Sequence, residues 1–197
     1  MLSPRFLVIS LGNPKPYHDC LHSAGHYALA AAQRVLAPEQ PPLTETRYGW
    51  KNCKVSSASP YTFVQSPTLM NVSGHWILAA YRETLERHAL QPSELALVLV
   101  HDELESPMYA VGIREWETSH RGHNGVKSAK KSLGSQGYPL DRWARITIGI
   151  GRPDERTPAV VSGHVLRHMT SQEKRTIDAL VGPKVVEALH KLRDEQE

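Results

Sequence analysis

The most apolar segment of the chain is LALVLV at 95–100, six consecutive aliphatic residues. Six residues are too few for a buried helix, and a strand whose residues do not alternate between apolar and polar is covered on both faces. A second run, Phe6–Leu11, is apolar except for Ser10 and has the same character. Two such strands need helices on both sides of a sheet, so we expect an α/β fold.

Helical and extended segments alternate along the rest of the chain. Apolar spacing and the capping box Thr170-x-x-Glu173 predict helices at 24–36, at 71–90, at 124–133, from 170 and again after 183. Weaker patterns predict extended segments at 48–55, 61–65, 109–116 and 144–150. We interpret Gly182-Pro183 as a break between two helices. We therefore expect one domain over residues 1–197, with a twisted, mixed or largely parallel sheet flanked by helices.

Composition narrows the class of protein. The 197 residues carry a net charge of only +3, so any role with nucleic acid depends on where Lys and Arg gather. Two cysteines without a CxxC pair are typical of a reducing compartment. No apolar stretch approaches the roughly 20 residues of a membrane span, and residues 1–10 do not have the features of a signal peptide. A cytoplasmic protein without membrane contact is expected, with a mitochondrial location as the alternative.

Polar residues follow three of the expected strands, namely Asn13, Asp102 and Arg152. In open α/β folds, ligands bind beyond the carboxyl ends of the strands. Asp102, within HDEL, is suited to accept an imidazole N–H and to hold a histidine in the tautomer of a general base, and His22 is its natural partner. The alternative is that Asp102 is a helix cap or a turn residue.

Two metal sites are conceivable, and we expect neither. His18, His22 and His26 recur at four-residue intervals, as zinc ligands on a helix do. Pro14 and Pro16, however, argue against placing His18 on that helix, and neither an HExxH glutamate nor a fourth ligand is nearby. Glu103 and Glu105 could bind Mg²⁺, but no second acidic group has matching spacing. Solvated histidines and turn carboxylates are the simpler interpretations.

Neutral amides and basic residues complete the candidate set. Asn13, Asn71 and Asn124 stand beside turns and could orient a water molecule and stabilise an oxyanion, although Asn71 also has the position of a helix cap. The expected helix that starts at Asn124 has a basic face that includes Lys127, close to a helix N-terminus that favours anions. A solvated helix face would look the same, so this pattern alone is weak evidence for a phosphate backbone.

Taken in order, six motifs resemble those of the bacterial-type peptidyl-tRNA hydrolases over about residues 6–188. The motifs are Gly12-Asn13-Pro14, Tyr17 with His22-x-Ala24-Gly25, Met70-Asn71-x-Ser73-Gly74, HDEL at 101–104, GHNGVKS at 122–128 and RITIGIGRP at 145–153. The resemblance implies a monomeric α/β enzyme without cofactor. It also implies that the substrate is peptidyl-tRNA, whose ester bond between peptide and 3′ ribose is cleaved.

The resemblance also implies roles for individual residues. His22 matches the catalytic histidine and Asp102 its orienting acid, while the three asparagines match site amides. Further matches are Tyr17 and Met70, which would line the crevice, and Arg145 and Arg114, which would bind a tRNA phosphate. The chain departs from the family pattern at Ser23, Leu69 and Arg121, and throughout 106–120.

The mechanism expected from these residues is ester hydrolysis without a metal, with His22 taking a proton from the attacking water. A non-catalytic RNA-binding protein, like the splicing-factor relatives of this family in plant organelles, is the main alternative. A metal-dependent phosphohydrolase is a third. The presence of His22, Asp102 and Asn71 together favours the hydrolase.

Overall fold

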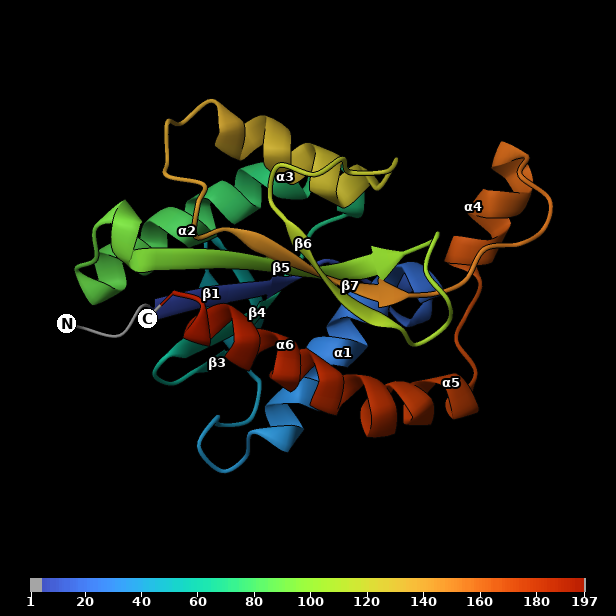
Figure 1. Ribbon diagram of the computed structural model, residues 1–197, viewed down its shortest axis with the longest axis horizontal. Coiled ribbons are helices and arrows are strands. Elements are labelled where there is room, and N and C mark those ends of the chain that lie inside the picture. Colours follow the sequence, from blue (N-terminus) through green and yellow to red (C-terminus); the bar gives the residue numbers. More distant parts are fainter. Residues whose placement is uncertain (1–4, 197) are drawn as a thin grey trace.

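The computed structural model describes residues 5–196, which form one seven-stranded mixed sheet between two layers of helices (Figure 1). The strands are β1 (Arg5–Ser10), β2 (Thr44–Tyr48), β3 (Lys51–Ser57), β4 (Tyr61–Gln65), β5 (Leu95–Glu103), β6 (Val111–Glu115) and β7 (Ala144–Gly149). Their order is β2-β3-β4-β1-β5-β7-β6. The β1–β4, β1–β5 and β5–β7 pairs are parallel and the other three pairs antiparallel. The predicted α/β architecture is confirmed.

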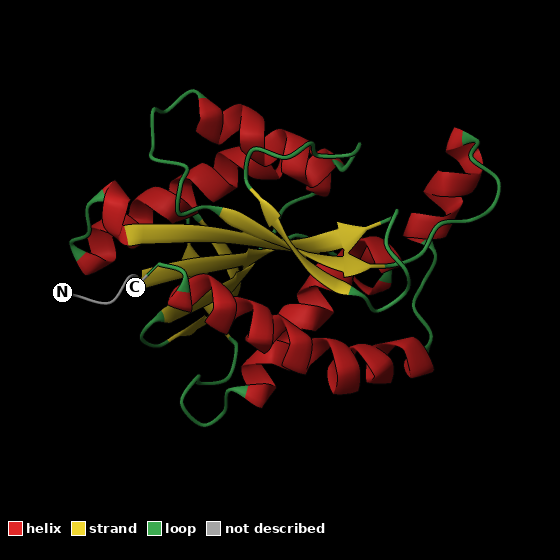
Figure 2. Ribbon diagram, in the orientation of Figure 1, coloured by secondary structure: helices red, strands yellow, loops and turns green. Residues whose placement is uncertain are grey.

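Helices cover both faces of the sheet (Figure 2). The helices are α1 (Ala24–Val35), α2 (Ser73–His88), α3 (Asn124–Gly134), α4 (Pro158–Leu166), α5 (Ser171–Thr176) and α6 (Gly182–Asp194). Short 3₁₀ turns are η1 (Tyr17–Asp19), η2 (Leu21–Ser23), η3 (Met70–Val72) and η4 (Pro92–Glu94), and η5 (Ile177–Val181) is a π-helical turn. Within residues 5–196, no helix combines the length and the apolarity needed to cross a membrane.

The central strands are buried on both faces, as the apolar runs predicted. In β1, Phe6 and Val8 pack on the side of α1 and α6, whereas Leu7 and Ile9 pack on the side of α2 and α3. All four side chains are fully buried, and each contributes about 1.5–3 kcal/mol to folding. The carboxyl ends of β1 and β5 are therefore fixed from both sides, which makes them a rigid support for a site.

The predicted break at Gly182-Pro183 is wrong. The helix that begins with α5 runs through η5 into α6 without interruption. The Gly182 N–H donates to the Ile177 carbonyl five residues earlier, a π-helical bond, and Pro183, which has no N–H to donate, directly follows this π-helical turn. A Cβ at Gly182 would lie 2.8 Å from the Ala31 Cβ, so this glycine allows close packing on α1 and does not end a helix.

Two other segments differ from the sequence-based expectation. The extended segment expected at 48–55 is part of a hairpin, in which β2 and β3 are joined by Gly49 and Trp50 with φ of 51° and 63°. Helix α4 was not predicted. None of its residues is buried, and it stands off the body of the molecule beyond the arrowheads of β5 and β7 (Figure 1). A helix without a buried face shows no apolar periodicity by which to find it.

Candidate active site

A cavity of about 730 Å³ lies beyond the carboxyl ends of β1 and β5. Asp102, the penultimate residue of β5, and His22, on η2, both line it. Asn13, Tyr17, Met70, Asn71 and Asn124 also line it, as the sequence predicted for residues of one site. Arg114, Arg145 and Lys127 are not among the lining residues. Most of the candidate residues therefore lie together beyond the carboxyl ends of the strands, where ligands bind in open α/β folds.

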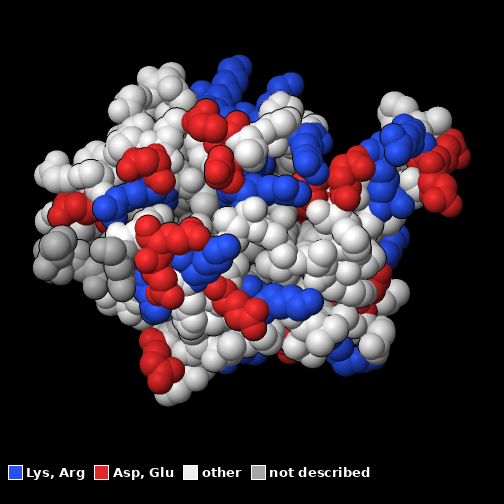
Figure 3. Space-filling model, viewed as in Figure 1, with Lys and Arg blue, Asp and Glu red and all other residues white. Residues whose placement is uncertain are grey.

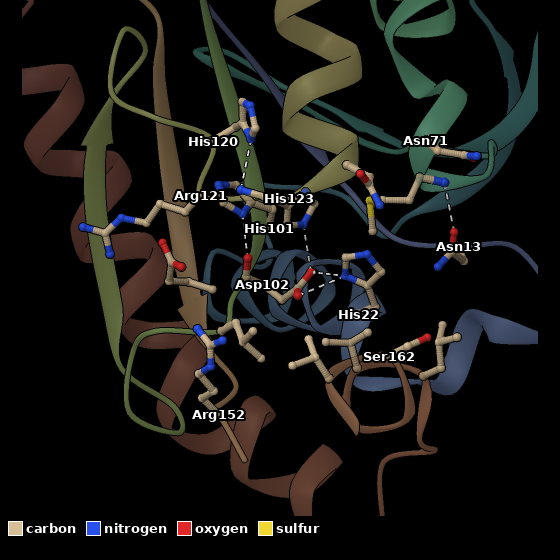
Figure 4. Close-up of a pocket in the computed structure, with 18 of the residues that line it drawn as sticks. Asn13, His22, Asn71, His101, Asp102, His120, Arg121, His123, Arg152 and Ser162 are labelled. Carbon is tan, nitrogen blue, oxygen red and sulfur yellow. Dashed lines mark hydrogen bonds and ion pairs between the residues drawn. The ribbon is translucent and has the colours of Figure 1, made fainter. Parts of the chain in front are cut away.

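Asp102 is the centre of the polar contacts and is 3% exposed. The Nδ1 atom of His22 lies 2.9 Å from one carboxylate oxygen of Asp102 and 3.0 Å from the other. The Nε2 atom of His123 lies 3.0 Å from the first of these oxygens. Figure 4 shows the two imidazoles converging on the carboxylate from separate elements. The contact between His22 and Asp102 that the sequence predicted is therefore present, and His123 is an addition.

The protonation states follow from these contacts. Burial alone would raise the pKa of Asp102, but the two facing histidines hold it far below its ordinary value. An ionised carboxylate only accepts hydrogen bonds, so Nδ1 of His22 and Nε2 of His123 both donate. Burial lowers the pKa of His22, whereas the charge and hydrogen bond of Asp102 raise it, with a net rise. The lone pair of His22 is left on Nε2, which is the atom a general base would use.

His123 is the functional candidate that the sequence reasoning missed. It is the N-cap of α3, where its Nδ1 accepts the Val126 N–H at 3.2 Å. Because Nδ1 is an acceptor, the ring proton is on Nε2, which faces Asp102. The edge of His101, a buried neutral ring whose burial lowers its pKa to about 3, packs against His123 with 4.6 Å between centroids. The available signal was its position directly before a predicted helix.

Asn13 and Ser23 connect the turn after β1 to the next segments of the site. The Asn13 side-chain oxygen accepts the Met70 N–H at 2.9 Å. The Asn13 N–H donates to the Ser23 hydroxyl at 3.0 Å, and that hydroxyl donates to the Tyr17 carbonyl at 2.9 Å. Ser23, one of the departures from the family pattern, thus holds the Asn13 turn against η1. A Cβ at Gly125 would meet the Met70 sulfur at 2.5 Å, so the side chain of Met70, on η3, packs directly against the start of α3.

The other two asparagines lie at the rim of the cavity. Asn71 and Asn124 are exposed, and neither makes a side-chain hydrogen bond within the described residues. In Figure 4 the side chain of Asn71 points away from His22. Tyr17 and Leu69, which are 43% and 49% exposed, add an aromatic and an aliphatic surface to the same rim. These side chains are therefore available to a ligand.

Arg145 does not lie at the surface. It is 2% exposed, and its guanidinium donates to the Thr118 carbonyl at 2.8 Å and the Ser119 carbonyl at 3.3 Å. Burial lowers its pKa, the charge of Glu103 raises it, and the neighbouring Arg114 lowers it again. Arg145 therefore holds the segment after β6. The prediction that Arg145 contacts a tRNA phosphate directly is not supported by its buried position.

Other basic residues are accessible near the cavity. Arg114 lies opposite Arg145 in register and is half-buried. Arg121 is exposed at the rim with a φ of 46°, a conformation that is strained for a residue with a side chain. On α3, Lys127 is exposed, whereas the Lys130 ammonium donates to the Thr118 carbonyl. Figure 3 shows Lys and Arg side chains over α3 and beside α4, which itself contains neither residue type.

Neither of the two metal sites considered from the sequence is formed among the described residues. His26 is buried against the Ser10 hydroxyl at 2.8 Å, and His18 stacks on His26, so neither faces His22's partner Asp102. Glu105 pairs with Arg152. Within the described residues, one set could hold a metal by distance, since His22, Asp102 and His123 offer ligand atoms within 4.8 Å. The N–H protons of His22 and His123 point at the Asp102 carboxylate and occupy the space between the ligand atoms. This set therefore does not favour a metal.

The chain is similar to one family of enzymes over nearly its whole length. The model of the family described as peptidyl-tRNA hydrolase matches residues 7–196. A peptidyl-tRNA hydrolase of Geobacter metallireducens is 33% identical over 180 residues, which cover 89% of this chain and 82% of that protein. One of Akkermansia muciniphila is 30% identical over 92% of this chain and 86% of its own length.

A solved structure supports the fold. The crystal structure of peptidyl-tRNA hydrolase from Acinetobacter baumannii matches with a TM-score of 0.65 over 98% of this chain and 96% of that chain. At 21% identity, this match bears on the fold alone. It agrees with the layered sheet described above.

Proposed function

Because this chain belongs to the peptidyl-tRNA hydrolase family, we propose that its cavity hydrolyses the ester bond between a peptide and the 3′ ribose of tRNA. The observation that carries the proposal is the imidazole of His22, which donates from Nδ1 to the buried Asp102 and so keeps a lone pair on Nε2. Such an imidazole is the general base that ester hydrolysis by water requires.

His22 would act on water and not on a protein nucleophile. In the proposed step, Nε2 takes a proton from a water molecule as the water oxygen attacks the ester carbonyl. The imidazolium that forms is stabilised by the negative charge of Asp102, and its proton then passes to the leaving ribose oxygen. A positioned base of this kind accelerates the reaction by about 10²–10⁴.

The amides around the cavity would orient the substrate. Asn124, whose side chain has no partner within the described residues, is suited to bind the peptide backbone or the attacking water. The side chain of Asn71 also has no partner there, but it points away from His22, so it is suited to bind the peptide only. The side-chain oxygen of Asn13 accepts the Met70 N–H, so the NH₂ group of Asn13 remains to polarise the ester carbonyl. Amides that pair with a blocked peptide reject a charged free α-amine, which would give selectivity for peptidyl over aminoacyl esters.

The tRNA would bind on the side of the cavity where α3 begins. Arg121 lies at the rim, Arg114 lies on β6, and Lys127 lies on α3 three residues after Asn124, which lines the cavity. Cations of this kind attract the phosphate backbone without reading its sequence. We propose that Arg121, which is exposed at the rim of the cavity, takes part in this contact together with Arg114.

We further propose that hydrolysis needs no metal. The side chains of His22, Asp102 and His123 hold one another by hydrogen bonds, and the base is provided by His22 itself. A metal at this position would have to displace two N–H protons, and the His123 ring would lose its cap on Val126.

The test is the release of the acyl group from N-acetyl-aminoacyl-tRNA by purified protein in the presence of EDTA, with free aminoacyl-tRNA as the matched control. We expect hydrolysis of the blocked ester and little of the free one. Binding of tRNA without cleavage would instead identify a non-catalytic RNA-binding protein, and loss of activity in EDTA would identify metal-dependent chemistry.

A further inference from the structure

Helix α4 lies against the cavity but is not part of the packed core. Its sequence, PAVVSGHVL, is largely apolar, yet none of its nine residues is buried. Pro158, Val161, Ser162, Val165 and Leu166 all line the cavity. Most helices in proteins gain their stability from packing an apolar face, and α4 packs little of its surface. The contacts that hold it in place therefore need to be identified.

One end of α4 is held by main-chain hydrogen bonds to the turn that carries His22. The Leu21 N–H donates to the Arg167 carbonyl at 3.1 Å, and the Met169 N–H donates to the Asp19 carbonyl at 2.8 Å. These bonds fix the chain just after the helix. They leave the residues that line the cavity, one to two turns earlier, without a main-chain attachment to the body within the described residues.

Near its C-terminal end, α4 is held by the side chain of His164, in addition to the packing of Val165 on the core. The Nε2 atom of His164 lies 3.1 Å from the Ile150 carbonyl oxygen and 3.0 Å from the Gly151 carbonyl oxygen, at the point where the chain leaves β7. Both partners are acceptors, so Nε2 carries a proton and donates to them. The Ile150 residue is 1% exposed, and a buried carbonyl without a partner is costly.

We infer that His164 is a positioning residue, which fixes α4 so that Val161 and Val165 form an apolar surface for the acyl part of the substrate. This inference rests on the proposed function, since it takes the ligand to be the peptide of peptidyl-tRNA. His164 itself faces the body and does not touch the reacting atoms. His164 acts through the position of α4, so the binding of an acyl chain with apolar side chains should depend on His164 most.

A pair of variants separates the hydrogen bond from the packing of the ring. His164→Phe keeps a ring of similar size but has no donor, whereas His164→Gln keeps an N–H donor of similar reach. With N-acetyl-dileucyl-tRNA, we expect His164→Phe to raise KM by about three- to tenfold, which corresponds to the loss of one hydrogen bond, with kcat within about twofold of wild type. His164→Gln should restore KM to within about twofold.

Trypsin provides a second measurement that does not depend on activity. Arg156 is exposed directly before α4, so cleavage after it reports how often this segment leaves the body. We expect faster cleavage at Arg156 in His164→Phe, and a rate like that of wild type in His164→Gln. Equal KM values and equal cleavage in all three proteins would overturn the inference. If the wild type does not hydrolyse blocked aminoacyl-tRNA, the proposed function fails. The rates of trypsin cleavage at Arg156 still decide the role of His164 in that case.

Discussion

The cavity has two walls that are held in different ways. One, here called the body wall, consists of His22, Asp102 and His123, which are joined by hydrogen bonds and supported by strands buried on both faces. The other, the α4 wall, consists of Val161, Ser162, Val165 and Leu166, on a helix with no buried residue. The chemistry we propose belongs to the body wall, where a misplaced base is costly. The α4 wall offers apolar surface that adapts to different peptides.

The largest effect should come from the body wall itself. We expect His22→Ala to lose about 10²–10⁴ of the hydrolysis rate with little change in tRNA binding, because it removes the base and leaves the basic rim intact. Single-turnover kinetics with N-acetyl-aminoacyl-tRNA measure the rate, and a filter-binding assay measures the affinity. His18→Ala is the matched control, since His18 stacks on His26 outside the carboxylate contact, and it should be active.

Asp102→Asn should reduce the rate by up to about 10⁴, an effect comparable to the loss of His22, because the base remains but is held in the wrong tautomer. An asparagine can present its NH₂ to the rings and then favours the wrong proton position. The measurement is kcat at saturating substrate, with circular dichroism to show that the variant is folded. An unchanged kcat in a folded variant would separate Asp102 from the chemistry.

His123→Ala should have an intermediate effect on the body wall. It removes one of the two donors to Asp102 and also the cap on the Val126 N–H. We expect a several-fold fall in kcat, and a loss of stability of about 1 kcal/mol, which is about 2–4 °C in Tm at this size. His120→Ala, in the same segment but without contact to Asp102, is the control. Equal kcat values in the two variants would show that His123 acts only as the N-cap of α3.

The smallest effect should come from the α4 wall. Val161→Ala removes apolar surface from the cavity, so KM for a leucine-rich peptidyl-tRNA should rise by about two- to fivefold while kcat stays unchanged. Val160→Ala is a matched control on the same helix, because Val160 does not line the cavity. If kcat falls in Val161→Ala as much as KM rises, the two walls do not divide chemistry and peptide binding as we propose.

The sequence predicted the frame and two of the three residues of the body wall, because these depend on patterns that the sequence shows. The run Leu95–Val100 identified a buried strand, and the polar residue at its end identified Asp102. The contact with His22 followed because the carboxyl ends of parallel strands meet at one edge. His123 was missed although its position before Asn124 is that of a helix cap.

The parts that could not be predicted depend on contacts between distant segments. The burial of Arg145 depends on the loop at 115–119 that folds over it. The continuity of the helix through Gly182 depends on packing against Ala31. Helix α4 buries no face, so it has no periodic signal, and its attachment through His164 depends on carbonyls at the end of β7.

The most direct test of the central claim is the pH dependence of kcat/KM for N-acetyl-aminoacyl-tRNA between about pH 5 and 8.5, a range that brackets the ordinary pKa of histidine. The base form of His22 is the neutral one, and Asp102 raises its pKa, so activity should rise with pH through a single ionisation above about 6.5. In Asp102→Asn the midpoint should move to lower pH, because the charge that raised the pKa is gone. A rate independent of pH over this range, or the same midpoint in both proteins, would contradict the assignment of an Asp102-held His22 as the base.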